Sequence, residues 1–459
     1  RRLEPVRAQV QGRISDEVRA LVRELLGLPK RQLFVTSAPT DLSFVLTMPG
    51  EFDLTGLTCK EVPPAKNVAL QKGDYFAYLA QHDLLLALPY QSINPFVDLL
   101  YEAADDPDVV SIKITLYRLA GSIAAALAYA AEHGKQVQCL LELRARFDEQ
   151  SNIDYSRMLE DAGCSILYGL TKYKVHTKLC LITRRCPGGI CYYTQVGTGN
   201  YNEKTAEQYT DLMLLTSDPA IGRDAAKTFD RLARGETVGE TEALWLAPEG
   251  YKPQLLAYID AQTRLGPKGY IGIKVNSMND ADVMARLVRA SEAGTEVELF
   301  VRGICCLRPG VPGRTEHISV RSIIGRYLEH ERIFVFGRGE AQEVFIGSGD
   351  LLERNTMRRI EAFTAVTDPN ARAEVLEVLS AMRRDNRQAW IMQPDGSYLR
   401  PEPGRAVREP DVPAHVLRRA HRHKIRTLCP APAAKKAAVV AAAVDLAVEQ
   451  LTKKAGIWS

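Results

Sequence analysis

The sequence predicts an α/β protein made of two duplicated halves, each with a mixed, mostly parallel sheet flanked by helices. Two observations carry this prediction. From about residue 70, short apolar runs alternate with segments of helical periodicity, a pattern typical of strands joined by helices. The same order of elements then returns about 150 residues further along the chain.

The composition is that of an ordinary globular protein. Of the 459 residues, 46% are apolar and 25% are charged, which excludes a disordered or collagen-like chain. The net charge of +3 does not by itself indicate a nucleic-acid or membrane partner. No stretch approaches the roughly 20 apolar residues of a membrane span. Nine cysteines without a CxxC motif argue against a zinc ribbon or a thioredoxin-like site and fit a reducing cytoplasm.

Residues 1–68 are expected to be the remnant of a helical domain. They contain one clear helix, 16–26, with Ser15 as its N-cap. The segment is too short to form a domain alone, and the chain begins with Arg-Arg rather than Met. We therefore expect a fragment or a processed chain.

Strands and helices alternate through residues 69–236, which we take as the first half. In chain order the pattern predicts a strand at 109–117, a helix at 123–132 stopped by Gly134, a strand at 137–143, a helix at 155–162 and a strand at 165–168. The second half, 237–395, repeats this order. There the pattern predicts a strand at 270–275, a helix at 281–293 stopped by Gly294, and a strand at 297–301.

Matching motifs support a true duplication of the two halves. Gly197-Thr-Gly-Asn corresponds to Gly347-Ser-Gly-Asp at an offset of 150 residues. The same offset relates Asp211 to Glu361, and an Asp-Pro pair at 218 to another at 368. Three features at one offset favour one repeated unit over two unrelated domains.

Residues 396–459 differ in character and are expected to form a linker and a tail. A proline-rich stretch leads into a basic run at 418–426 and an Ala/Lys-rich predicted helix. We expect a solvated tail, with a polyanion-binding tail as the alternative.

Each half contains one histidine with a cation two residues later. These are His176 with Lys178, and His330 with Arg332. Alternate residues of a strand share a face, so the imidazole and the cation would point at one locus. A histidine followed by a basic residue is usually structural, but here it occurs twice, in step with the duplication and ahead of a Gly-x-Gly turn. A neutral imidazole beside a bound phosphate can act as a nucleophile, and a second one as general acid or base.

Arginines follow several predicted strands. Arg118, Arg144 and Arg146 follow strands of the first half, and Arg302 follows the strand 297–301 of the second. In open α/β sheets ligands bind beyond the carboxyl ends of the strands. A single guanidinium group can donate two parallel hydrogen bonds to phosphate oxygens, so this arrangement favours a phosphate-binding cleft. No second His or Cys lies at ligand spacing from either histidine, which argues against a metal held by them.

Several longer motifs resemble the bacterial polyphosphate kinase family, which has two phospholipase-D-like catalytic halves. In the first half they are LELRARFDE at 141–149, VHTKL at 175–179, GTGNYNEKTA at 197–206 and YTD at 209–211. In the second half they are VRGICCL at 301–307, YLEH at 327–330 and RIE at 359–361. The resemblance runs from about residue 1 to 395.

The resemblance implies a reversible transfer of the ATP γ-phosphate to inorganic polyphosphate through a phosphohistidine. His176 would be the phosphorylated residue, and His330 would face it as ATP-site partner and proton donor or acceptor. Tyr209 would stack on the adenine, and Arg302 would hold the nucleotide phosphates. Arg118 and Arg146 would belong to a magnesium–phosphate site; because arginine is not a metal ligand, we expect both to contact the phosphates that Mg²⁺ bridges.

The resemblance also implies ATP and ADP, inorganic polyphosphate and Mg²⁺ as ligands, with no specific nucleic acid. It implies a cytoplasmic location, allows peripheral membrane association, and implies homo-oligomers for complete members of the family. The family's usual N-terminal domain is absent from this sequence.

Two other functions stay open at this stage. A phospholipase-D-like phosphodiesterase or nuclease would use the same paired histidines without ATP. An inactive fragment would only bind polyphosphate.

Overall fold

The computed structural model describes residues 5–37, 39–41, 45, 48, 63–65, 70, 73–117, 121–142 and 149–401. The chain divides into two compact units, and the larger one, Glu61–Ala433, contains both halves of the duplication. In the smaller unit, helix α1 (Asp16–Leu26) lies in the connection between two short strands, β1 (Ala8–Gln11) and β2 (Leu33–Thr36), which pair with each other in parallel. The hydroxyl of Ser15 accepts a hydrogen bond from the backbone of Val18 (3.3 Å), which confirms the predicted N-cap.

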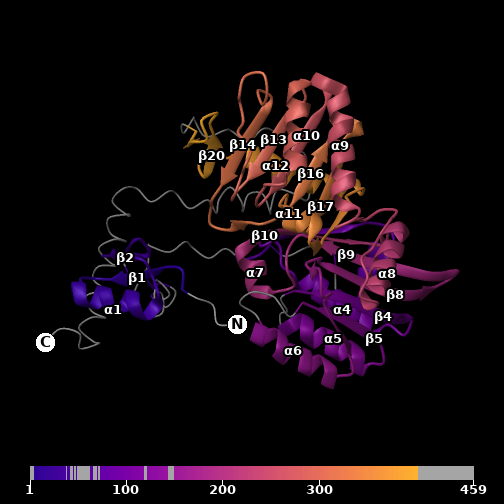
Figure 1. Cartoon of the computed structure of the whole chain (residues 1–459). Coiled ribbons are helices and arrows are strands. Elements are labelled where there is room, and N and C mark those ends of the chain that lie inside the picture. The colour runs from indigo at the N-terminus through magenta and orange to yellow at the C-terminus, as the bar shows by residue number, and fades with distance from the viewer. Residues whose placement is uncertain are drawn as a thin grey trace. The chain divides into compact units, whose positions relative to one another are not determined.

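The first half is built around an eight-stranded sheet with the order β15-β10-β9-β8-β4-β5-β6, in which β3 also pairs with β10 and β15 (Leu328–Glu329) comes from the second half. Figure 1 labels β10, β9, β8, β4 and β5 of this sheet. Its own strands are β3 (Leu84–Leu88), β4 (Val109–Leu116), β5 (Gln136–Leu141), β6 (Ser165–Tyr168), β8 (Leu179–Cys186), β9 (Gly189–Gly197) and β10 (Tyr209–Thr216). Its helices are α3 (Tyr75–Leu79), α4 (Asn94–Asp105), α5 (Gly121–Glu132), α6 (Glu149–Asp161), α7 (Glu203–Gln208) and α8 (Pro219–Ala233).

The second half has a nine-stranded sheet with the order β11-β19-β17-β16-β12-β13-β14-β20-β21. The strands are β11 (Trp245–Leu246), β12 (Tyr270–Val275), β13 (Glu296–Val301), β14 (Ile318–Ile323), β16 (Ile333–Phe336), β17 (Glu343–Gly347), β19 (Ala362–Ala365), β20 (Ala389–Met392) and β21 (Tyr398–Leu399). The helices are α9 (Tyr251–Leu265), α10 (Ala281–Glu292), α11 (Glu353–Met357) and α12 (Pro369–Arg384).

The α/β class and the duplication are confirmed. Parallel pairing occupies the strand–helix–strand core of each half, β4-β5-β6 and β12-β13-β14, as the alternating pattern predicted. Antiparallel strands complete both sheets, because the segment that follows each histidine runs back as a hairpin without a crossover helix. The β8–β9 hairpin is longer than its counterpart β16–β17, so the offset between the halves falls from 154 residues at His176 and His330 to 150 at the Gly-x-Gly turns.

Apolar side chains of the two halves share one core. Leu85 and Leu212 of the first half pack with Ile333 and Val344 of the second, and all four are buried. The arrangement of the two halves relative to each other is therefore fixed by the burial of apolar side chains between them, which is the dominant favourable term in folding. None of the helices in the described ranges is long and apolar enough to cross a membrane.

Cysteines take two forms in the described residues. Cys139, Cys164 and Cys180 are free and buried, as expected for thiols acting as small hydrophobes. Cys186 and Cys191 form a disulfide across the turn of the β8–β9 hairpin. The sequence did not predict this pair, because the two residues become neighbours only when the hairpin forms.

Candidate active site

Two short parallel strand pairs connect the halves and carry the histidines. β7 (Lys174–Val175) pairs with β18 (Arg359–Ile360), and β10 pairs with β15 (Leu328–Glu329). In each pair one strand leads into a histidine of one half and the other into a carboxylate of the other half. The backbone N–H of His176 donates to the carbonyl of Ile360 (2.9 Å), and that of His330 donates to the carbonyl of Thr210 (3.2 Å).

Each histidine therefore meets a carboxylate from the opposite half. His176 Nδ1 lies 2.9 Å from Glu361 Oε2, and His330 Nδ1 lies 2.9 Å and 3.0 Å from the two carboxylate oxygens of Asp211. When the carboxylate is ionised, the Nδ1–H group donates to it, and Nε2 is left with its lone pair. The arrangement can thus present two neutral imidazoles to one substrate.

The Gly-x-Gly turns hold these carboxylates, a role that we did not expect for them. Thr198 Oγ1 donates to Asp211 Oδ1 (2.6 Å), and Ser348 Oγ donates to Glu361 Oε2 (2.5 Å). Asn355 Nδ2 also donates to Glu361 (2.7 Å). In each turn, the hydroxyl of the second residue therefore orients the carboxylate, and that carboxylate orients the histidine.

Cations surround the paired histidines. The buried ammonium of Lys178 donates to the backbone carbonyl of His176. Arg332 Nη1 lies 3.3 Å from both ring nitrogens of His330 and donates to the carbonyls of His330 (2.7 Å) and Thr198 (3.2 Å). Arg332 thereby connects the second histidine to the turn of the first half. As expected, each cation lies at the histidine that precedes it by two residues.

The electrostatics keep both imidazoles neutral. Burial and the nearby charge of Lys178 hold the pKa of His176 well below its usual value. His330 also contributes to this lowering of the pKa of His176, so the two rings share one electrostatic environment. Burial likewise lowers the pKa of His330, although the carboxylate of Asp211 opposes it. Neutral imidazole is the form that can attack phosphorus.

Two further buried groups titrate near neutrality. Burial raises the pKa of Glu361 to about 7, against the opposing charge of Lys178. Burial lowers the pKa of Lys178 to about 7, against the opposing charge of Glu361. The protonation state around His176 is therefore sensitive to pH in the physiological range.

The second histidine has an aromatic ring and an arginine beside it. Tyr209 is the first residue of β10, and the centroid of its ring lies 5.2 Å from the centroid of the His330 ring. Arg302 follows β13 directly, as predicted, and its Nε donates to Asn276 Oδ1 (2.8 Å). Asn276 Nδ2 in turn donates to the carbonyl of His330 (3.3 Å). The structure thus brings together His176, His330, Tyr209 and Arg302.

Comparison with known proteins agrees with this geometry. Residues 74–237 match the family model "Polyphosphate kinase C-terminal domain 1", and residues 244–409 match "Polyphosphate kinase C-terminal domain 2". The chain belongs to the polyphosphate kinase family. These two regions carry His176 and His330 respectively, so each contributes one histidine to the site.

Relatives within the polyphosphate kinase family are similar over most of the chain. The polyphosphate kinase of Rhodopirellula baltica is 41% identical over 404 residues, which are 87% of this chain and 47% of the relative. That of Streptomyces coelicolor is 42% identical over 86% of this chain and 55% of the relative. The chain therefore spans about half the length of the curated relatives that it matches. The crystal structure of polyphosphate kinase from Porphyromonas gingivalis is 31% identical, with a TM-score of 0.78 over 91% of this chain and 64% of that one.

The predicted magnesium–phosphate residues cannot be placed. Arg118 and Arg146, together with Arg144, lie outside the described residues. Within the described ranges no three His, Cys, Asp or Glu side chains form a group that could hold a metal ion. The carboxylates nearest the histidines, Asp211 and Glu361, are already engaged by imidazoles. These residues do not fit a resident metal ion, and a magnesium ion that accompanies nucleotide phosphates would belong to the substrate.

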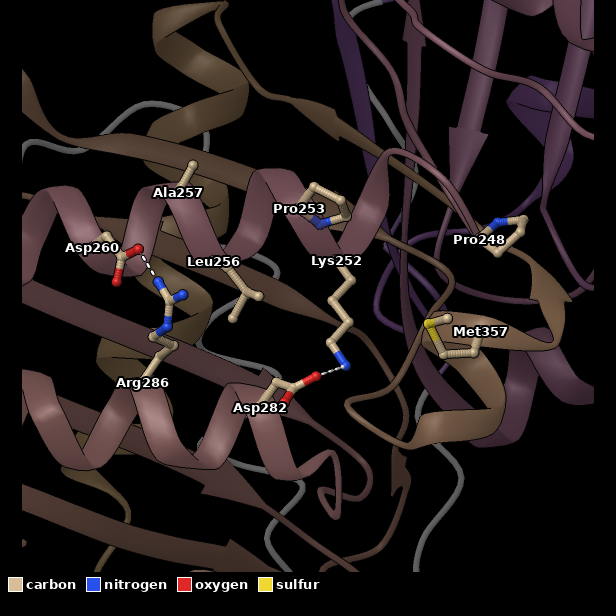
Figure 2. Close-up of a pocket in the computed structure, with 9 residues that line it drawn as sticks. All are labelled: Pro248, Lys252, Pro253, Leu256, Ala257, Asp260, Asp282, Arg286 and Met357. Carbon is tan, nitrogen blue, oxygen red and sulfur yellow. Dashed lines mark hydrogen bonds and ion pairs between the residues drawn. The ribbon is translucent and has the colours of Figure 1, made fainter.

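A cavity of about 540 Å³ lies elsewhere in the second half, between α9 and α10 (Figure 2). Its charged side chains are paired with one another: Lys252 with Asp282 (2.6 Å), and Arg286 with Asp260. Neither histidine lines this cavity. It is therefore not the candidate active site.

Sequence reasoning missed three kinds of site residue. It did not assign the orienting carboxylates, although the offset that relates Asp211 to Glu361 was a signal for them. It also missed Asn276 and Tyr117, whose ring packs edge-on against His176 with a centroid distance of 4.9 Å. Asn276 directly follows the predicted strand 270–275 and Tyr117 ends the predicted strand 109–117, so both lie at the edge where ligands bind, and this position was the available signal.

Proposed function

We propose that this chain catalyses the reversible transfer of the ATP γ-phosphate to inorganic polyphosphate through a phosphohistidine. The observation that carries the proposal is the reciprocal pairing of His176 with Glu361 and of His330 with Asp211 inside one buried, cation-rich site. Two halves that each supply the other's orienting carboxylate present two imidazoles to a single phosphoryl group. Membership of the polyphosphate kinase family supports the choice of substrates.

His176 is the proposed nucleophile. With Nδ1–H donating to Glu361, Nε2 attacks the γ-phosphorus of ATP, the bond to the β–γ bridging oxygen breaks, and ADP leaves with the bond's electrons. A terminal oxygen of polyphosphate then attacks the phosphohistidine, the N–P bond breaks, and Nε2 recovers its lone pair while the polymer gains one phosphate. Arg332 lies against both ring nitrogens of His330, which favours His176 as the unobstructed ring.

The second histidine and its neighbours form the proposed nucleotide side. His330 would hold or donate a proton at the leaving oxygen, Tyr209 would stack on the adenine, and Arg302 would grip the nucleotide phosphates. Arg118 and Arg146 would contact phosphate oxygens bridged by Mg²⁺. Phosphoryl transfer depends mainly on positioning and charge neutralisation, which this concentration of cations can supply.

The charge arrangement beside His176 supports an anionic polymer. Lys174 lies directly opposite Arg359 in the register of β7 and β18, and Arg359 Nη1 is 3.9 Å from Glu361. These two cations close to the histidine would attract an anionic polymer.

Labelling with ³²P tests the function directly. The chain is incubated with γ-labelled ATP and a polyphosphate primer, and acid-insoluble polymer is counted. Label in polymer supports the proposal. Cleavage of a phosphodiester without ATP would support the phosphodiesterase alternative, and binding of polyphosphate without any label on protein or polymer would support an inactive binding fragment.

We further propose a cytoplasmic location; homo-oligomerisation and peripheral membrane association stay predictions.

A further inference from the structure

We propose that Asn276 is a positioning residue that ties Arg302 to His330, so that the phosphate-gripping and imidazole groups of the nucleotide side are held as one unit. The inference rests on the proposed function, in which both groups serve the nucleotide. It assigns a role to a side chain that touches neither the polymer nor the nucleophile.

The side-chain amide of Asn276 is used at both ends. Its Oδ1 accepts from Arg302 Nε (2.8 Å), and its Nδ2 donates to the carbonyl of His330 (3.3 Å). The residue is buried, with 5% of its surface exposed. A buried amide needs both an acceptor and a donor partner, and only an amide side chain of this length supplies the two groups here.

The backbone around Asn276 is fixed independently of its side chain. Its N–H donates to Asp350 Oδ1 (2.8 Å), and its carbonyl accepts from the N–H of Gly303 (2.8 Å). Asp350 also accepts from Arg332 Nε (3.2 Å), so the second cation of the site is anchored at the same point. Because hydrogen bonds of its main chain hold residue 276 in place, a change of its side chain tests the link between Arg302 and His330 and not the fold.

The tie leaves Arg302 with a defined grip. Among the described residues, Asn276 is the one hydrogen-bond partner of the Arg302 guanidinium, and the contact is made through Nε. A guanidinium anchored at Nε presents its two Nη groups side by side, which is the fork that binds phosphate oxygens in pairs. Asn276 therefore sets the direction of the fork as well as its place.

The two halves differ at this position, which supports a role specific to the nucleotide side. Asn276 directly follows β12, and Tyr117 directly follows the equivalent strand β4. Tyr117 packs its ring against His176, whereas Asn276 bonds to the backbone of His330 and to an arginine. Two residues earlier, Thr115 and Lys274 hold the same position in the parallel pairing of their strands with β5 and β13. The register of the strands therefore supports treating Tyr117 and Asn276 as equivalent positions.

A double-mutant cycle on ADP affinity tests the tie. Dissociation constants for ADP are measured by calorimetric titration of the purified chain and of Asn276→Ala, Arg302→Ala and the double variant. We expect Asn276→Ala to weaken ADP binding about tenfold, the scale of one hydrogen bond to a charged group. In the Arg302→Ala background, Asn276→Ala should weaken ADP binding less than about twofold, because the guanidinium that Asn276 orients is already absent.

Asn276→Asp keeps the acceptor of the side chain but removes its donor and adds a negative charge. The carboxylate still accepts from Arg302, but its charge opposes binding of the nucleotide phosphates, so ADP affinity should fall at least as far as in Asn276→Ala. The carboxylate cannot donate to the His330 carbonyl, so turnover in polymer synthesis should fall severalfold. Asn279→Ala is the matched control: this exposed residue lies in the same loop and its side chain accepts from the backbone of Glu353 (3.2 Å), so ADP affinity should not change.

Three results would overturn the inference: unchanged ADP affinity in Asn276→Ala, full additivity in the cycle, or no ADP binding by the parent chain. Failure of the proposed function is recognised separately, because it appears as absence of ³²P-labelled polymer from a parent chain that still binds ADP. In that case the cycle still decides the role of Asn276.

Discussion

His176 Nδ1 and Glu361 Oε2 lie 2.9 Å apart although 185 residues separate them in sequence. The relation is reciprocated, because His330 of the second half meets Asp211 of the first. Neither half therefore contains a complete histidine–carboxylate pair. Each histidine–carboxylate pair therefore needs both halves of the chain, and the apolar core between the halves holds the two pairs in place.

Replacement of His176 by Ala should abolish acid-labile labelling of the protein by γ-³²P-ATP, because no nucleophile remains to form the phosphohistidine. Labelling is measured after neutral and after acid treatment. His133→Ala is the control, since that histidine is exposed and its ring bonds to the backbone carbonyl of Tyr129 in the preceding helix. Full labelling of the His176 variant would refute the assignment of the nucleophile.

Much of this architecture could be predicted from the sequence. The core strands and helices follow from apolar periodicity, and the repeated turns at 197 and 347 revealed the duplication. The pairing of each histidine with the opposite carboxylate could not be predicted, because it depends on how the halves dock through strand pairings of two residues each. Pairings so short leave no periodicity in the sequence, and their register is set by tertiary contact.

The function of single side chains was predicted unevenly for the same reason. Arg302 could be proposed as a phosphate-binding residue because it directly follows a regular strand. Asn276 was not, because its importance comes from two partners that lie 26 and 54 residues away in sequence. Local patterns report where a residue sits on its own element, whereas a hydrogen-bonding hub is defined by what other elements bring to it.

Replacement of His330 by Ala should lower turnover by about 10²–10⁴-fold, the usual contribution of a positioned acid or base. Asp211→Asn should give a smaller loss in the same direction, because it leaves the ring but weakens its orientation. Steady-state polymer synthesis measures both. Unchanged rates in His330→Ala would exclude the two-sided site.

The rate of His176 phosphorylation should rise with pH through about 7. Burial raises the pKa of Glu361 to about 7. Below that pH its O–H donates to Nδ1 and the ring proton moves to Nε2, which blocks attack; above it, Nδ1–H donates to the carboxylate and Nε2 is free. Single-turnover labelling from pH 5.5 to 8.5 tests this, and Glu361→Gln should flatten the rise.

Lys178 titrates in the same range, so its effect must be separated from that of Glu361. Burial lowers the pKa of Lys178 to about 7, and its charge is therefore lost as the pH rises. Lys178→Arg keeps a cation at every pH tested. If the rise with pH persists in this variant, Glu361 causes it; if it disappears, the ammonium of Lys178 does, and the assignment to Glu361 is wrong.

Replacement of Gly199 by Ala should reduce turnover about as much as Asp211→Asn. A Cβ atom at residue 199 would overlap the carboxylate of Asp211, which is the group that orients His330. Gly239→Ala is the matched control, because its Cβ would meet only Glu249 at an ordinary 3.7 Å. Polymer synthesis should fall in the first variant alone; equal activity of the two would mean that the turn can shift without moving the carboxylate.

Replacement of Arg302 by Lys should raise the KM for ATP roughly ten- to a hundredfold although the positive charge is kept. Lysine cannot form the paired hydrogen bonds of a guanidinium, and it is too compact to bond to Asn276 and to a phosphate in the same orientation. The KM for polyphosphate should change much less, because the polymer passes the cations beside His176. Initial rates with each substrate varied in turn separate the two constants. Equal KM values for ATP in the parent and the variant would show that Arg302 acts only as a charge, and the bidentate grip would have to be abandoned.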